Sequence, residues 1–211
     1  MSEAKGLLAV WMEPKPENEG DLNRWYAEEH LPERMAVPGF ASARRYVSDD
    51  ASRTYIALYR LTDVGVLAGE AYQHVVRHST PWTRRVVDNL NGFVRNEYSL
   101  EATQGDFSAP AAPYAYLVRL DCAEENRDEM RRWYVEEHLS CIAGVEGVTS
   151  SSLYIATAGT PRFLAVHEVA SAQIPRSEAW NRAVGTPWTE RMRALFTDRA
   201  SNLGRLIAQM R

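Results

Sequence analysis

The sequence predicts an α+β fold made of two βαββαβ units within one chain of 211 residues. Three observations lead to this prediction. The octapeptide RWYAEEHL at 24–31 returns as RWYVEEHL at 132–139, so that seven of eight letters agree at a separation of 108 residues. Short apolar runs, several of them alternating, lie around each copy, as is typical of strands. A segment rich in alanine, proline and small polar residues at 101–113 has the composition of a linker.

The repeat extends well beyond the octapeptides. At the same separation, YIALYRL at 55–61 matches FLAVHEV at 163–169. TPWT at 80–83 returns at 186–189, with the separation shortened to 106 residues. Self-similarity over this length indicates a repeated structural unit. We therefore expect a first repeat at 1–104, a linker at 105–113 and a second repeat at 114–211.

Each half predicts the same elements in the same order. The first half predicts strands at 6–12, 40–48, 54–61 and 92–98, with helical regions at 21–35 and 67–91. The second half predicts strands at 114–120, 148–155, 162–169 and 203–209, with helical regions at 126–142 and 176–200. Thr80–Pro81 and Thr186–Pro187 should each begin a new helix, because threonine is a favourable N-cap and proline fits the first helical turn.

This order of elements is ferredoxin-like. The sheet of such a unit carries helices on one face only, and its other face needs a cover. A second copy of the unit is the simplest cover. We therefore expect the two repeats to form an internal pseudo-dimeric α+β barrel.

Composition and charge narrow the classes of function. The net charge is −4 and no basic tract is present, so nucleic acid and membrane surfaces are not expected partners. No apolar run reaches the roughly 18 residues of a membrane span, and the first residues show no signal peptide, so a cytoplasmic location is expected. Cys122 and Cys141 lack metal-binding spacing and are expected to be free thiols. Homo-oligomerisation is left open.

The repeated octapeptide supplies the first candidate site. On a helical wheel, Glu29 and Glu137 fall inside the apolar stripe of their helices. A carboxylate in that position is costly unless it is paired or hydrogen-bonded. The expected partners are Arg85 and Arg191, or the N-terminus of the adjacent helix.

A histidine follows each of these glutamates, at the edge of the stripe. Imidazole titrates near neutral pH, so His30 could act as a general acid or base with Glu29 as the partner that orients it or raises its pKa. His138 and Glu137 repeat the pair. The alternative is structural, with both residues closing the helix and bonding to the second helix of the unit.

The strands supply a second group of candidates. Ile56 and Leu58 should pack under the helices, so Tyr59 should lie on the opposite face of the sheet, as should His167 in the second half. A pocket of aromatic and cationic side chains suits an aromatic or carboxylated small molecule. The predicted substrate-binding residues are Trp11, Tyr26, Arg44, Tyr46, Tyr59, Arg119 and His167. Alternatively, the polar residues among them only join the two sheets.

The segment WYAEEHLPERMAVPGFASARRY at 25–46 resembles the dimeric α+β barrel superfamily, near its EthD-like members. The resemblance covers both halves, although Ser140 and Glu146 replace Pro32 and Pro38 in the second. It implies small-molecule chemistry. The superfamily includes cofactor-free monooxygenases, isomerases and cyclases of aromatic or lactone substrates, haem enzymes, and proteins without an assigned activity.

We therefore expect an enzyme without cofactor or metal, an isomerase, cyclase or lyase that acts by proton transfer on an aromatic or oxygenated ring. A non-catalytic ligand-binding or accessory protein is the alternative, and a cofactor-free monooxygenase or haem-binding variant comes third. His74 and His78 have i,i+4 spacing but no accompanying ligand residue, so no metal site is predicted. Because Arg44 has Ser152 as its counterpart, the first half is expected to hold the functional site.

Overall fold

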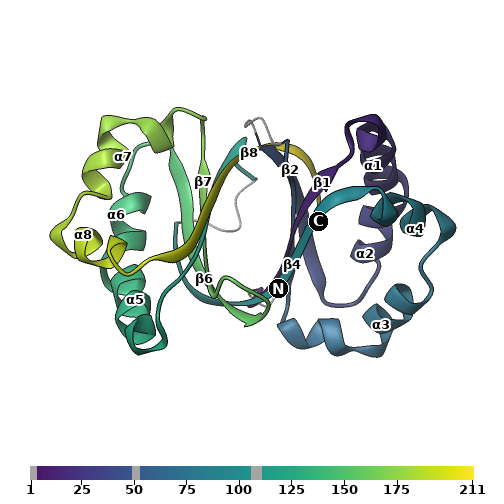
Figure 1. The fold of residues 1–211 in the computed structure, drawn as a ribbon, viewed down its shortest axis with the longest axis horizontal. Helices are drawn as coiled ribbons and strands as arrows, with labels where there is room; N and C mark the ends of the chain where they lie inside the picture. Colours follow the sequence, from purple (N-terminus) through teal and green to yellow (C-terminus); the bar gives the residue numbers. More distant parts are fainter. Residues whose placement is uncertain (1–3, 49–52, 106–110) are drawn as a thin grey trace. The chain divides into compact units, whose positions relative to one another are not determined.

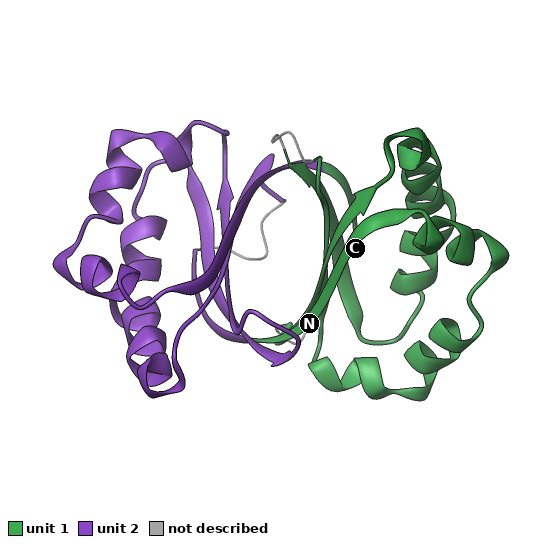
Figure 2. Ribbon diagram, viewed as in Figure 1, with its two compact units in different colours: residues 1–99, 207–211 green, residues 100–206 purple. Residues whose placement is uncertain are grey.

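The computed structural model describes residues 4–48, 53–105 and 111–211. The chain divides into two compact units, residues 1–99 with 207–211 (unit 1) and residues 100–206 (unit 2), which Figure 2 shows in different colours. Within the expected linker, residues 106–110 lie outside the described residues. The expected domain boundaries and the expected pairing of the two sheets stay predictions.

Unit 1 has the order βαββαβ (Figure 1). Its sheet is antiparallel in the order β4–β1–β3–β2. The strands are β1 (Gly6–Pro14), β2 (Phe40–Ser48), β3 (Tyr55–Leu61) and β4 (Leu90–Gly105), the last of which ends in unit 2. The helices are α1 (Glu19–Trp25), the π-helical turn η2 (Tyr26–His30), α2 (Leu31–Met35), α3 (Glu70–Arg77) and α4 (Pro81–Asp88), with short 3-10 turns η1 (Pro16–Asn18) and η3 (Val64–Ala68).

Unit 2 repeats this order, with its sheet in the order β8–β5–β7–β6. The strands are β5 (Tyr114–Asp121), β6 (Val148–Ala158), β7 (Phe163–Val169) and β8 (Thr197–Met210), the last of which ends in unit 1. The helices are α5 (Arg127–Trp133), the π-helical turn η5 (Tyr134–His138), α6 (Leu139–Ala143), α7 (Glu178–Ala183) and α8 (Pro187–Arg193), with 3-10 turns η4 (Glu124–Asn126) and η6 (Ile174–Arg176). In each unit the helices lie on one side of the sheet (Figure 1).

The sequence repeat is also a repeat of strand register. Gly6 lies opposite Leu61, and Tyr114 lies opposite Val169, so both partners are displaced by 108 residues. The same irregularity follows the first residue of β2 and of β6. Helix α7 has six residues where α3 has eight, which accounts for the shortened separation of the TPWT motifs. The predicted α+β class and the order of elements are confirmed.

Two features of the helical layer differ from the prediction. The first helix of each unit contains a π-helical turn in the middle of the octapeptide, at 26–30 and 134–138. A π turn changes the angular spacing of side chains, so a regular wheel misplaces the residues within it. The expected helical region at 176–200 ends early, because α8 stops at Arg193 and Thr197 already pairs with Asp121 in the sheet.

The prediction of which side chains of β3 and β7 pack against the helices is wrong. Tyr55, Ala57 and Tyr59 pack in one cluster with residues of α1 and η2, so they face the helices, and Ile56 lies on the opposite face. Phe163 and Ala165 do the same in unit 2. All five residues from Tyr55 to Tyr59 are buried. A strand that is buried on both faces is apolar along its whole length. Its sequence therefore does not show which face packs against the helices.

Among the described residues, no helix has the length and apolar character that crossing a membrane requires.

Candidate functional site

Each unit holds a cavity between its sheet and its helices. The cavity of unit 2 has a volume of about 550 Å³, and that of unit 1 about 230 Å³. The aromatic, imidazole and cationic side chains lining the larger cavity are Tyr116, Trp133, Tyr134, His138, His167, Trp180, Arg193, Phe196 and Arg199. Those lining the smaller cavity are Trp25, Tyr26, His30, Arg34, Tyr59, Tyr72, Phe93 and Arg95.

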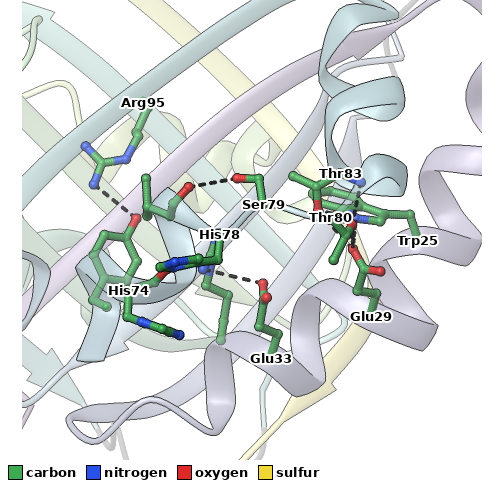
Figure 3. A network of polar contacts seen from close by, with 12 residues as sticks. Trp25, Glu29, Glu33, His74, His78, Ser79, Thr80, Thr83 and Arg95 are labelled. Atoms are coloured by element: carbon green, nitrogen blue, oxygen red, sulfur yellow. Dashed lines mark hydrogen bonds and ion pairs between the residues drawn. The ribbon is translucent and has the colours of Figure 1, made fainter. Parts of the chain in front are cut away.

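The octapeptide and the TPWT motif of each unit bind each other. In unit 1, one carboxylate oxygen of Glu29 accepts hydrogen bonds from Trp25 Nε1 (3.0 Å), Thr80 Oγ1 (2.7 Å) and Thr83 Oγ1 (2.9 Å), as Figure 3 shows. Thr80 caps α4 at the same time, because its hydroxyl accepts from the backbone N–H of Thr83 at 3.0 Å. Partial burial acts to raise the pKa of Glu29, but these hydrogen bonds outweigh it and hold that pKa below its usual range.

Unit 2 contains a similar set of hydrogen bonds between its octapeptide and its TPWT motif. Glu137 accepts a hydrogen bond from Thr186 Oγ1 at 2.6 Å, and Trp133 Nε1 donates to Thr189 Oγ1 at 3.1 Å. Thr186 caps α8. The predicted N-cap threonines are therefore confirmed in both units, and the glutamates join the first helix to the N-terminus of the fourth.

The expected pairing of the two glutamates with Arg85 and Arg191 is wrong. Arg85 donates to Asp21 at 3.1 and 3.2 Å, and Arg191 lies 3.5 Å from the carbonyl oxygen of Pro187. Among the hydrogen bonds of the described residues, none joins Glu29 to His30. The carboxylates thus serve the helix junction, and the histidines face a different environment.

Glu29→Leu is expected to lower the free energy of unfolding by about 1–3 kcal/mol, because it leaves the hydroxyl and indole donors around it without their acceptor. Arg85→Leu is the control and should cost less than Glu29→Leu, since its ion pair with Asp21 is exposed to solvent. Urea unfolding followed by circular dichroism measures both. A larger loss for Arg85→Leu than for Glu29→Leu would contradict this assignment.

His138 and His167 are the two histidines that line the larger cavity. The ring of His138 lies 4.1 Å from that of Trp133, and its Nδ1 makes no hydrogen bond among the described residues. Burial, with smaller contributions from His167 and Arg193, lowers the pKa of His138 to about 3. His167 Nδ1 lies 2.7 Å from the hydroxyl of Ser151, and burial lowers the pKa of His167 to about 3. Both imidazoles are neutral at physiological pH.

Unit 1 has one histidine in the corresponding place. His30 lies 4.1 Å from the Trp25 ring, centroid to centroid, and Tyr59 occupies the position of His167. Burial, followed by the charges of Arg34 and Arg45, holds the pKa of His30 well below its usual range. The expectation that a neighbouring carboxylate raises this pKa is therefore wrong, because the nearby charges are cationic.

The predicted substrate-binding residues do not converge on one cavity. Tyr26 and Tyr59 line the cavity of unit 1, and His167 lines that of unit 2. The other four lie on the sheet face away from the helices, as their register with Ile56 and Leu164 and their alternation with helix-facing neighbours show. They are Trp11, Arg44, Tyr46 and Arg119.

The larger cavity contains cations that the sequence prediction missed. Arg193 ends α8 and Arg199 lies in β8, and both side chains line the cavity. Their counterparts in unit 1 at a separation of 106 residues are Val87 and Phe93. A search for residues shared by the two halves passes over such positions.

No protein-family model matches the sequence, and no curated protein is similar to it in sequence. The fold, by contrast, has clear neighbours, and they place the chain in the ferredoxin-like α+β class.

The chain is similar to an anthrone oxidase-like protein, with a TM-score of 0.72 and 14% identity over 99% of this chain and 93% of that one. It is similar to a provisionally named monooxygenase from Fusobacterium nucleatum, with a TM-score of 0.68 and 9% identity over 98% and 94% of the two chains. A ferredoxin fold protein from Listeria monocytogenes, related to antibiotic biosynthesis monooxygenases, gives a TM-score of 0.55 at 9% identity over 98% and 97%. Identities this low show the fold alone.

Proposed function

We propose that the protein is a small-molecule enzyme and that the cavity of unit 2 is its active site. The observation that supports this proposal is a cavity of about 550 Å³ lined by two neutral imidazoles and two arginines. Ligand pockets usually span about 300–1,000 Å³ and combine an apolar wall with a few convergent polar groups. The aromatic walls of this cavity suit a ring compound that bears a hydroxyl or carbonyl group.

The residues support a proton-transfer reaction. His138 accepts a proton from a carbon or oxygen of the ring compound, and the electron pair that remains is delocalised onto a substrate oxygen as an enolate or phenolate. The negative charge that forms beside His138 favours the imidazolium and offsets the burial that lowers its pKa in the free protein. Arg193 and Arg199 line the same cavity, and their positive charges stabilise that oxyanion. Ser151 holds the ring of His167 through the contact at Nδ1. Return of the proton to another atom completes an isomerisation, and ring closure or loss of a leaving group gives a cyclase or lyase.

Unit 2 replaces unit 1 as the favoured location. The argument for the first half rested on Arg44, which lies on the sheet face away from the helices and outside both cavities. The cavity of unit 1 is also less than half as large.

A cofactor-free monooxygenase is the second candidate. The same enolate or phenolate could react with dioxygen, and two of the similar structures carry names that refer to monooxygenases. Oxygen consumption separates the two candidates, because proton transfer alone consumes none.

The test is a panel of anthrones, hydroxynaphthalenes and related keto compounds, followed by absorbance and by an oxygen electrode. Turnover without oxygen uptake supports the isomerase, cyclase or lyase, and turnover with uptake supports the monooxygenase. Binding without turnover supports the accessory ligand-binding protein, and an intense absorbance near 400 nm in the purified protein supports a haem-binding variant. A protein that neither binds nor converts any ring compound contradicts the proposal.

A further inference from the structure

The cavity of unit 1 differs in chemistry from that of unit 2. Arg34 lines it at the position where unit 2 has Ile142, and Arg95 lines it at the position of Ser201. We propose that this cavity is a second ligand site, which takes a monocarboxylate with an apolar ring body. This site is independent of the activity proposed for unit 2.

Arg34 and His30 form the polar end of the site. Arg34 is only 8% exposed, and its Nη1 makes no hydrogen bond among the described residues. Its ion pair with Glu33 is long, at 3.5 Å, and its guanidinium lies 5.3 Å from the centroid of the Tyr72 ring. His30 Nδ1 is likewise buried without a hydrogen bond among the described residues. Buried donors are normally satisfied, and a carboxylate supplies the acceptors that a guanidinium fork fits best.

Arg95 has a different role. Its guanidinium donates to Glu97 at 2.8 Å and to the hydroxyl of Tyr72 at 3.4 Å, as Figure 3 shows in part. Its charge is therefore largely offset by Glu97. Arg34 meets Glu33 only at 3.5 Å, through the same Nη1 that makes no hydrogen bond among the described residues, so its charge is less completely offset than that of Arg95. This arrangement suits a ligand with a single negative charge.

The apolar end of the site lies at three exposed side chains. Val76, Val87 and Phe93 line the cavity and are 42%, 47% and 53% exposed. They make up half of the large hydrophobic side chains that are exposed among the described residues. Exposed apolar side chains gathered at a cavity commonly mark a binding site. An apolar cavity of about 150 Å³ holds benzene, so 230 Å³ is enough for a ring that carries a carboxylate.

Isothermal titration calorimetry with sodium benzoate, sodium 2-naphthoate and 2-naphthamide tests the proposal. The naphthoate should bind more tightly than benzoate because it covers more of the apolar end, and at least about tenfold more tightly than the neutral amide, because a charge-assisted bond is lost in the amide. Arg34→Ile installs the residue type that unit 2 carries at this position, and it should weaken naphthoate binding at least about tenfold. Arg182→Leu changes an exposed arginine outside both cavities, so it is the control and should leave the affinity within about twofold.

A second measurement locates the ligand independently of Arg34. In protein labelled with ¹³C-histidine, the ring signal of His30, assigned with His30→Gln, should move on addition of 2-naphthoate, while those of His138 and His167 stay in place. Equal affinity for acid and amide, unchanged binding in Arg34→Ile, movement of only the His138 and His167 signals, or no binding overturns the proposal. None of these results depends on turnover, so the proposed enzyme activity stands or falls separately.

Discussion

His138→Gln is expected to reduce turnover of the ring substrate by about 10²–10⁴-fold, which is the usual contribution of a general acid–base residue. His138 lines the larger cavity and keeps an imidazole nitrogen without a hydrogen bond among the described residues. Glutamine is similar in length and polar but cannot accept the proton. The rate constant should be measured with saturating substrate, at a temperature where both proteins are folded.

His30→Gln is the matched control, because it changes the same position of the octapeptide in the other unit. It should leave turnover within a few-fold of the parent protein. Equal losses in the two variants would show two equivalent sites. A loss confined to His30→Gln would place the active site in unit 1, and no loss in either variant would show that neither histidine is the general base.

The free energy of unfolding is expected to fall steeply as pH is lowered from about 6.5 towards 3. His138 and His167 have pKa values of about 3 in the folded protein, against an ordinary value of 6.5. Between these limits the unfolded chain binds protons that the folded protein does not, so acid favours unfolding. Each of the two histidines contributes about 1.4 kcal/mol per pH unit in this window. Above pH 6.5 both states are neutral at these positions and the contribution is constant.

Urea unfolding at a series of pH values measures this dependence. His167→Gln should reduce the slope by about 1.4 kcal/mol per pH unit, because one of the two linked protons is removed. A flat profile between pH 6 and pH 4 would show that these imidazoles gain a proton as readily in the folded protein as in the unfolded chain, and would contradict the effect of burial on their pKa values.

The order of elements could be predicted because both halves of the sequence show the same pattern. The recurring octapeptide and TPWT motif fixed the alignment of the halves, and the strand register follows that alignment at 108 residues. The N-cap threonines Thr80 and Thr186 were also recognisable, because a capping hydroxyl before a proline is a local signal.

The face of each central strand could not be predicted in the same way. β3 is buried on both faces, so tyrosine and isoleucine were equally acceptable in either direction. The π-helical turn at 26–30 has no simple sequence signal. Because of this turn, the side chains of Glu29 and His30 point in other directions than a regular α-helical wheel predicts. The carboxylate therefore reached the threonines of α4, and the expected Glu29–His30 pair does not form.

The arginines of the larger cavity, Arg193 and Arg199, were not predicted, for a related reason. Residues that the halves share, such as Glu29 and Glu137 with their threonines, hold the fold together. The cavities differ at positions where the halves disagree. Unit 2 has His167 where unit 1 has Tyr59, and unit 1 has Arg34 where unit 2 has Ile142. His138 has His30 as its counterpart, whereas the other residues of the proposed chemistry lie where the repeats differ.

A crystal structure with a bound ring compound, chosen from the panel by its affinity, tests the central claim most directly. The account predicts electron density for the ligand between the sheet and the helices of unit 2, in contact with His138 and His167. Density on a sheet face away from the helices, against Trp11 in unit 1 or against Arg119 in unit 2, with the cavity of unit 2 unoccupied, would contradict it.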